Sequence, residues 1–386
     1  MEEIVFRDRR GTDCVKWDGL KEKFGEEDLI AMWVADMDFE APVCVKKALK
    51  EYVEKGVFGY YQVPDTYYNA FIDWEKKYHE YEVEKEWIRF SPGVVPAINW
   101  LIQLFTEEGD GVLFMPPVYF PFIGAVEANQ RKKVECPLKN EDGIYHMDIE
   151  TFEKKIQEEQ VKVFILCSPH NPVGRVWSRE ELKEVLDICK KHHVYVIADE
   201  IHQDLIPGDR KKVTAATVGN YDEILVTLTA ATKTFNLAGC SNAFVIIPDK
   251  KIRADFDRFI EKIHVMNGNA FGFVAVTAAY QGGRQWLDSV IEKIRFNYNR
   301  MKEMLEEQLP EAKVYPLEGT YLAWIDFGAY IPKEKMEEVI QGKAKVAVDF
   351  GSWFGGEEYS SFIRLNLATS TKNVENTINH IVSALK

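Results

Sequence analysis

Residues 223–239 read EILVTLTAATKTFNLAG, and this stretch decides how the whole chain is interpreted. Its first part, Glu223–Leu228, is an apolar run bounded by turn residues and predicts a buried strand. A second strand is predicted at 243–248, where a proline ends it. Lys233 therefore lies in a loop of small residues between two buried strands, where loss of water favours the neutral, nucleophilic amine. A loop lysine more commonly reaches solvent, so other motifs must decide whether Lys233 is a buried nucleophile or an exposed lysine.

Two further segments show the same layout, a strand followed by polar residues. Residues 161–167 (VKVFILC) predict a strand, and Asn171 follows shortly after its end. Residues 193–198 (HVYVIA) predict another strand, and Asp199 follows it directly. Because open parallel sheets bind ligands beyond the carboxyl ends of their strands, we expect Asn171, Asp199 and Lys233 to meet at one edge.

An amide, a carboxylate and a lysine amine at one edge suit an aldehyde cofactor bound covalently to the lysine, with the carboxylate on its pyridine nitrogen. Three motifs resemble those of the fold-type I pyridoxal-phosphate enzymes: NPVG at 171–174, DEIH at 199–202 and TKTFNLAG at 232–239. Three more are similar to the cystathionine β-lyase (carbon–sulfur lyase) branch of the class I/II aminotransferases: WVADMDF at 33–39, FGY at 58–60 and SPGVVP at 91–96. The resemblance extends from about residue 17 to residue 364.

The resemblance implies an α/β fold with a large and a small domain. The large, cofactor-binding domain at 46–285 is expected to carry a mostly parallel, mixed sheet flanked by helices. A smaller α+β domain is expected at 286–386, and residues 1–45 form an arm and part of that domain. Sequence periodicity predicts helices at 43–55, 67–81, 96–105, 149–159, 179–192, 249–266, 270–281 and 284–308. Further strands are predicted at 29–34, 87–90, 111–115, 313–315, 319–326, 346–348 and 362–366.

The bulk composition excludes several classes of protein. The chain has 386 residues and a net charge of −14, so nucleic acids and anionic membranes are poor partners. It has no run of 18 uncharged apolar residues and no signal-peptide pattern, and we expect a cytoplasmic protein. The six cysteines are dispersed and the eight histidines lack metal-ligand spacing, so neither disulfides nor a metal are expected.

A phosphate site is predicted where the strand at 87–90 leads through a glycine turn into a helix. Free backbone N–H groups and the helix dipole both favour an anion at a helix N-terminus. Strand–glycine–helix junctions are common, so this signal is weak without the nearby lysine. The expected phosphate cup is the backbone of Gly93, Val94 and Val95.

The resemblance adds side chains to this phosphate site. A hydroxyl of Thr229 or Thr232 is expected there, although many relatives have serine at the position of Ala230. The arginine that many aminotransferases place a few residues after the lysine is missing from Cys-Ser-Asn at 240–242. Tyr60, or its neighbour Tyr61, is expected to reach the phosphate of the other subunit, which implies a homodimer with shared active sites.

The resemblance also assigns roles around the cofactor ring. Lys233 carries the cofactor and then removes the α-proton of an amino-acid substrate, while Asp199 keeps the ring nitrogen protonated. Asn171 binds the ring oxygen, and His202 is a further contact. Tyr119 follows two prolines, which restrict its freedom, and its ring is expected to stack on the cofactor; ordinary packing is the alternative.

The substrate carboxylate is assigned to the other end of the site. Arg364 lies in an apolar strand, where a buried guanidinium requires a partner such as a planar carboxylate. Ala35 and Asp36 are expected close to the same carboxylate, on the rim of the pocket.

The same set of residues is compatible with more than one reaction. The resemblance implies β-elimination on sulfur amino acids: cystathionine to homocysteine, pyruvate and ammonia, and also cysteine or S-substituted cysteines. Transamination uses the same residues, and a regulatory binding protein that keeps the fold is a second alternative. An apolar lining suited to a thioether is expected from Met37, Phe39, Tyr119, Phe120 and Phe122, with no second arginine for a distal carboxylate.

Overall fold

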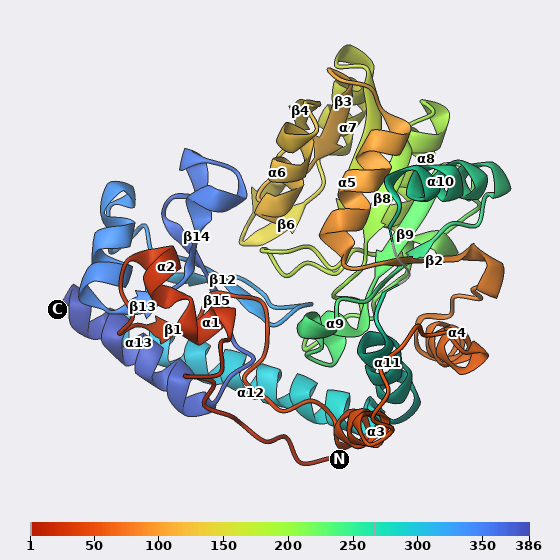
Figure 1. Cartoon of the computed structure of the whole chain (residues 1–386). Coiled ribbons are helices and arrows are strands. Elements are labelled where there is room, and N and C mark those ends of the chain that lie inside the picture. Colours follow the sequence, from red (N-terminus) through yellow and green to blue (C-terminus); the bar gives the residue numbers. More distant parts are fainter. Residues whose placement is uncertain (1, 266–267) are drawn as a thin grey trace.

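The computed structural model describes residues 2–265 and 268–386. Its largest sheet has seven strands in the order β2-β10-β9-β8-β7-β3-β4 (Figure 1). β10 is antiparallel to both of its neighbours, and the pairs from β9 to β4 are parallel. These strands are β2 (Ile88–Ser91), β3 (Gly111–Phe114), β4 (Lys132–Glu135), β7 (Val161–Cys167), β8 (Tyr195–Asp199), β9 (Leu225–Thr229) and β10 (Ala243–Ile246). The mostly parallel, mixed sheet predicted from the sequence is confirmed.

The central strands β7, β8 and β9 are mostly apolar and buried because helices cover both faces of the sheet. One face packs against α5 (Val94–Phe105), α6 (Phe120–Ala128) and α10 (Lys250–Ile263). The other face packs against α7 (Ile149–Glu158) and α8 (Arg179–Lys191). The Asp148 side chain caps α7, and Ser178 with Glu181 forms a capping box at the start of α8.

A second, four-stranded antiparallel sheet forms a separate layer in the order β11-β12-β15-β14 (Figure 1). Its strands are β11 (Lys313–Val314), β12 (Leu322–Asp326), β14 (Asp349–Phe350) and β15 (Phe362–Asn366). The long helix α12 (Arg284–Gln308) and the C-terminal helix α13 (Thr371–Leu385) pack together and share a core with this sheet. The same core extends to α3 (Val43–Val53), α4 (Asp65–His79) and α11 (Ala270–Gly282).

The N-terminal segment lies against the four-stranded sheet. It contains two short helices, α1 (Val15–Asp18) and α2 (Leu20–Phe24), and the strand β1 (Ile30–Ala31). β1 pairs in parallel with β13 (Val346–Ala347), while β5 (Lys139–Glu141) and β6 (Ile144–His146) form a separate hairpin. Within the described residues, no helix has the length and apolar character needed to cross a bilayer.

Candidate active site

Lys233 lies in a one-turn helix, α9 (Ala231–Thr234), directly after strand β9. Its Nζ donates a hydrogen bond to the backbone carbonyl of Ala35 (2.5 Å). Burial lowers the pKa of Lys233 to about 8, the Asp36 and Asp199 carboxylates oppose that effect, and Arg364 adds to it. Near neutral pH, far more of this amine is neutral than in an ordinary lysine, and the neutral amine can act as nucleophile and base.

Asp199 ends strand β8, which is the neighbour of β9 in the sheet. Its side chain is buried and accepts a hydrogen bond from the Ile201 N–H (3.0 Å). Burial raises the pKa of Asp199 to about 7, so the charged carboxylate lacks sufficient partners and would be stabilised by a cationic donor in the cavity. His202 lies one turn further on, and burial holds its pKa well below the usual value, so its ring is neutral.

Arg364 reaches the site from strand β15 of the smaller sheet. Its Nη1 donates to Oδ1 of Asn171 (2.9 Å), which leaves the Asn171 amide NH₂ free to donate to a ligand. Its Nη2 donates to Asp349, the residue directly opposite on strand β14. The side chains of Arg364 and Asp349 are at most 4% exposed, so this is a buried ion pair. Among the described residues, Nε of Arg364 has no hydrogen-bond partner.

The N-terminus of α5 forms the part of the site that is suited to bind an anion. Gly93 is its N-cap residue, with φ −179°, and the helix continues for 12 residues. The first N–H groups of a helix have no partner within the helix, so those of Val94 and Val95 are available to an anion. The Thr232 side chain lines the same cavity. The Thr229 hydroxyl faces the Glu200 carbonyl at 3.5 Å instead, and the structure does not bring it to the cavity.

Lys233, Asp199, Asn171 and the start of α5 surround one cavity of about 210 Å³, and Arg364 is bonded to Asn171 in its wall. Its walls are formed by Ala35, Pro92, Gly93, Val94, Val95, Pro96, Tyr119, Cys167, Asn171, Asp199, Ile201, His202, Thr232, Lys233 and Ala238. Cys167 is no candidate nucleophile, because burial raises the pKa of its thiol. The prediction that Met37, Phe39 and Phe122 line the pocket is wrong, since these side chains are at most 4% exposed and lie in hydrophobic cores. Phe120 does not line it either, because its ring packs against Trp353 and Phe354, whereas Tyr119 does.

Besides Thr229 and Arg364, which are not among the residues that line this cavity, two further predicted site residues lie outside it. The Asp36 side chain pairs with Arg9 (2.8 Å), so a substrate carboxylate would meet the backbone of this loop rather than the Asp36 carboxylate. Tyr60 is fully exposed and lies in a different surface cavity, together with Phe58, Tyr61 and Phe271. Its predicted role at the phosphate needs a second subunit and stays a prediction.

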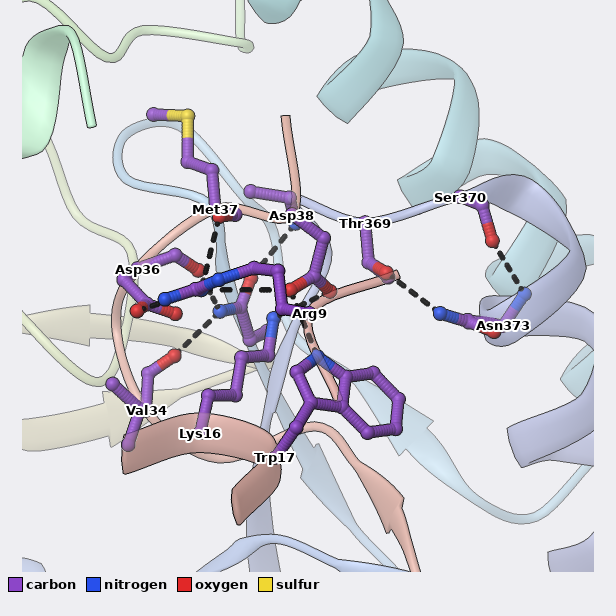
Figure 2. A network of polar contacts seen from close by, with 12 residues as sticks. Arg9, Lys16, Trp17, Val34, Asp36, Met37, Asp38, Thr369, Ser370 and Asn373 are labelled. Atoms are coloured by element: carbon purple, nitrogen blue, oxygen red, sulfur yellow. Dashed lines mark hydrogen bonds and ion pairs between the residues drawn. The ribbon is translucent and has the colours of Figure 1, made fainter. Parts of the chain in front are cut away.

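The loop 34–39, which supplies the acceptor for Lys233, is held by a buried polar network (Figure 2). Lys16 pairs with Asp38 (2.8 Å), and both side chains are completely buried. Asp38 also accepts a hydrogen bond from the indole N–H of Trp17 (3.0 Å). Arg9 lies between the carboxylates of Asp36 and Asp38, at 2.8 and 3.6 Å. The N-terminal segment therefore fixes this loop from the outside.

Two asparagines fix the same loop from the inside. Asn236, three residues after Lys233, donates to the carbonyls of Met37 (2.9 Å) and Phe39 (3.0 Å) and accepts from the Met37 N–H. Asn366, two residues after Arg364, donates to the carbonyls of Val34 and Asp36, both at 2.6 Å. The loop is thus attached to the chain segments that carry the lysine and the arginine.

Sequence reasoning missed Asp349 and Tyr321. Asp349 belongs to a two-residue strand, too short for any periodicity, although an acid shortly before the predicted strand of Arg364 was a usable signal. Tyr321 donates from its hydroxyl to the Ala35 carbonyl (2.8 Å), but its sequence context predicts only a strand. For Tyr321, nothing local in the sequence indicates this contact.

A lysine with a lowered pKa, a buried carboxylate on the neighbouring strand and a helix N-terminus face one cavity on this fold. Together they define a class of enzyme that binds a phosphorylated aldehyde cofactor through a lysine.

The chain belongs to the aminotransferase class I and II family, whose model matches residues 27–381. It is 40% identical over 381 residues to cystathionine beta-lyase PatB of Bacillus subtilis, with 98% of each chain covered. Among solved structures it is similar to a PLP-bound putative aminotransferase from Clostridium difficile (39% identity, TM-score 0.96, 99% of each chain). It is also similar to cystalysin from Treponema denticola, which contains pyridoxal 5'-phosphate (34% identity, TM-score 0.95, 99% and 98% covered). The fold-type I architecture predicted from the motifs is confirmed.

The residues of the cavity fit pyridoxal phosphate. Nδ1 of His202 is buried and has no hydrogen-bond partner among the described residues. Asp199 is a buried carboxylate that a protonated ring nitrogen would pair with, and the N–H groups at the start of α5 suit a phosphate. Tyr119 has a ring in the cavity wall, where a flat ligand can stack on it.

Proposed function

We propose that this protein is a pyridoxal-phosphate-dependent carbon–sulfur lyase. It cleaves the Cβ–S bond of cystathionine, cysteine or S-substituted cysteines by β-elimination. The observation that carries this proposal is the 40% identity to a cystathionine beta-lyase over nearly the full length of both chains. The geometry of the site supports the step that precedes elimination, the removal of the substrate α-proton.

Each side chain has a specific task in that step. Arg364 binds the substrate α-carboxylate, and Asn171 and Asp349 hold its guanidinium in place. This orientation brings the α-proton toward Nζ of Lys233, which removes it as general base. Asp199 would pair with the ring nitrogen of bound pyridoxal phosphate, Tyr119 would stack on its ring, and the start of α5 with Thr232 would hold its phosphate.

Pyridoxal phosphate, when bound, supplies an aldehyde that joins covalently to an amine and a ring that accepts the electron pair left by the departing α-proton. In the elimination, the Cα–H proton moves to Lys233, the Cβ–S bond breaks and its electron pair leaves with sulfur. The departing sulfur then takes up a proton to give the free thiol. The three-carbon enamine released from the site then reacts with one water to give pyruvate and ammonia.

A product assay separates this function from transamination. The protein is incubated with cystathionine, with and without an added 2-oxoacid, and pyruvate, ammonia and thiol are measured. A lyase forms all three catalytically without the 2-oxoacid. Pyruvate that appears only in stoichiometric amount, with amino-group transfer to 2-oxoacids, contradicts the lyase. Absence of both reactions supports a regulatory binding protein, although Lys233, Asp199 and Arg364 are all retained.

We also propose a homodimer with shared active sites. Val57, Phe58, Tyr60 and Phe271 are exposed, and the last three line a surface cavity of about 730 Å³. A cluster of exposed apolar and aromatic side chains marks an interaction surface more often than a free one. Tyr60 is the residue expected to reach the phosphate of the other subunit.

A further inference from the structure

Two hydrogen-bond donors share the backbone carbonyl of Ala35. One is Nζ of Lys233 (2.5 Å) and the other is the hydroxyl of Tyr321 (2.8 Å). A carbonyl oxygen has two lone pairs, so both of them are used here. Because the two bonds diverge from a single oxygen, the hydroxyl and the amine lie about 4 Å apart.

Tyr321 is rigidly placed, immediately before strand β12. Its side chain is completely buried, and its ring stands edge-on to His202, with ring centroids 5.9 Å apart. The neighbouring Thr320 N–H donates to the Leu205 carbonyl (2.7 Å), and the Leu367 N–H donates to the Tyr321 carbonyl (2.8 Å). The hydroxyl is therefore positioned by two backbone bonds, to segments that follow β8 and β15.

The position of the Ala35 carbonyl is equally restricted. The carbonyls on either side of it, those of Val34 and Asp36, both accept from Asn366. Figure 2 shows how Arg9 and Lys16 hold the following residues of the loop. Ala35 thus presents a fixed acceptor to the amine of Lys233.

Tyr321 donates its proton throughout the working pH range. Burial raises the pKa of its hydroxyl well above 10, and the Asp36 carboxylate adds to this effect. The charged groups that act on Lys233 are Asp36, Asp199 and Arg364. The titratable groups His202, Tyr119 and Cys167 line the same cavity, and the Tyr321 hydroxyl lies beside the amine. Of these, Tyr321 is the one that shares the acceptor of the amine.

We propose that Tyr321 is a positioning residue for Lys233. Its hydroxyl donates a hydrogen bond to one lone pair of the Ala35 carbonyl oxygen, and the free amine of Lys233 donates to the other. The amine is thereby held at a defined point when substrate has displaced it from the cofactor. This inference rests on the proposed function only for removal of the α-proton, a step that elimination and transamination share.

The test compares Tyr321→Phe with the matched variant Tyr298→Phe. Tyr298 also donates from its hydroxyl to a backbone carbonyl, that of Tyr315 (2.9 Å), but it lies on α12 and outside the cavity. The holoenzyme is incubated with L-alanine in D₂O, and exchange of the α-hydrogen is followed by NMR. Alanine has no leaving group, so this assay does not depend on the lyase reaction.

We expect maximal exchange by Tyr321→Phe to fall about tenfold, the effect of losing one positioning hydrogen bond, with an unchanged half-saturating alanine concentration. Tyr298→Phe should exchange like the wild type. Exchange by Tyr321→Phe within twofold of wild type, or an equal loss in Tyr298→Phe, overturns the proposal.

A second measurement uses the cofactor-free protein. The pH dependence of acetylation of Lys233 by acetic anhydride is followed by peptide mass spectrometry, and the wild type should show a midpoint near pH 8. Without the Tyr321 hydroxyl, the carbonyl binds the ammonium more strongly, so the midpoint should rise in Tyr321→Phe and not in Tyr298→Phe. An unmoved midpoint overturns the proposal. If wild-type holoenzyme fails to exchange alanine, the removal of the α-proton that the proposed function assigns to Lys233 is contradicted, and the acetylation midpoint still tests Tyr321.

Discussion

Replacement of Asp349 by asparagine tests the ion pair that holds Arg364. The change keeps the shape of the side chain and removes its charge, so the buried guanidinium is left with Asn171 as its partner. Removing one partner of a buried ion pair lowers the free energy of unfolding by about 3–5 kcal/mol. Because asparagine still offers one acceptor, we expect a loss of about 3 kcal/mol for the cofactor-free protein in urea denaturation.

The same variant should respond more strongly to a carboxylate ligand. Propionate can supply the missing negative charge to Arg364, so saturating propionate should stabilise Asp349→Asn more than the wild type. The matched control is Asp257→Asn, which breaks an exposed pair in which Arg89 donates twice (2.5 and 2.8 Å) and should lose less than about 1 kcal/mol. If Asp349→Asn is as stable as the wild type and propionate stabilises both equally, Asp349 does not hold Arg364.

Three further predictions concern the lysine, a buried acid and the subunit interface. Borohydride should trap the cofactor on the peptide that contains Lys233, and Lys233→Ala should lose several orders of magnitude in rate; trapping on another lysine contradicts the assignment. Burial raises the pKa of Glu75 from 4.5 to about 7, so the folded state holds a proton that the unfolded state releases in this interval. The contribution of Glu75 to the free energy of unfolding should fall by about 3 kcal/mol as pH rises from 4.5 to 7. Glu75→Gln should remove this fall, as measured by urea denaturation at several pH values. If the variant keeps the pH profile of the wild type, the assignment to Glu75 is refuted. Mixing Tyr60→Phe with Lys233→Ala subunits should restore part of the activity, because one site of each heterodimer is intact; a fully active monomer excludes shared sites.

The central sheet and its binding edge could be predicted because their signals are local. The apolar runs that became β7, β8 and β9 end within a few residues of Asn171, Asp199 and Lys233, and parallel pairing brings such ends together. The helices predicted to start at residues 149 and 179 also have local causes, because the side chains of Asp148 and Ser178 cap them. The domain boundaries placed at residues 45 and 285 stay a prediction.

The loop 34–39 was misjudged because its orientation depends on distant contacts. Met37 and Phe39 are apolar residues next to a predicted site, and a pocket lining was the natural expectation. The Asn236 side chain binds the backbone of both residues, and their side chains lie in the core. The role of Asp349 was hidden for a similar reason, because it depends on the cross-strand register of two strands joined by an irregular segment.

The buried ion pair of Lys16 and Asp38 is better explained by its effect on the position of the loop 34–39 than by its effect on the stability of the protein. Fully buried ion pairs can often be exchanged for apolar residues without loss of stability, so stability alone does not account for one beside an active site. Asp38 also donates from its backbone N–H to the Ala368 carbonyl (3.0 Å), two residues beyond Asn366. The loop is thereby attached to the strand that carries Arg364, while its Ala35 carbonyl binds the amine of Lys233. One piece of backbone thus connects the two groups to which we assign removal of the proton and orientation of the carboxylate, Lys233 and Arg364.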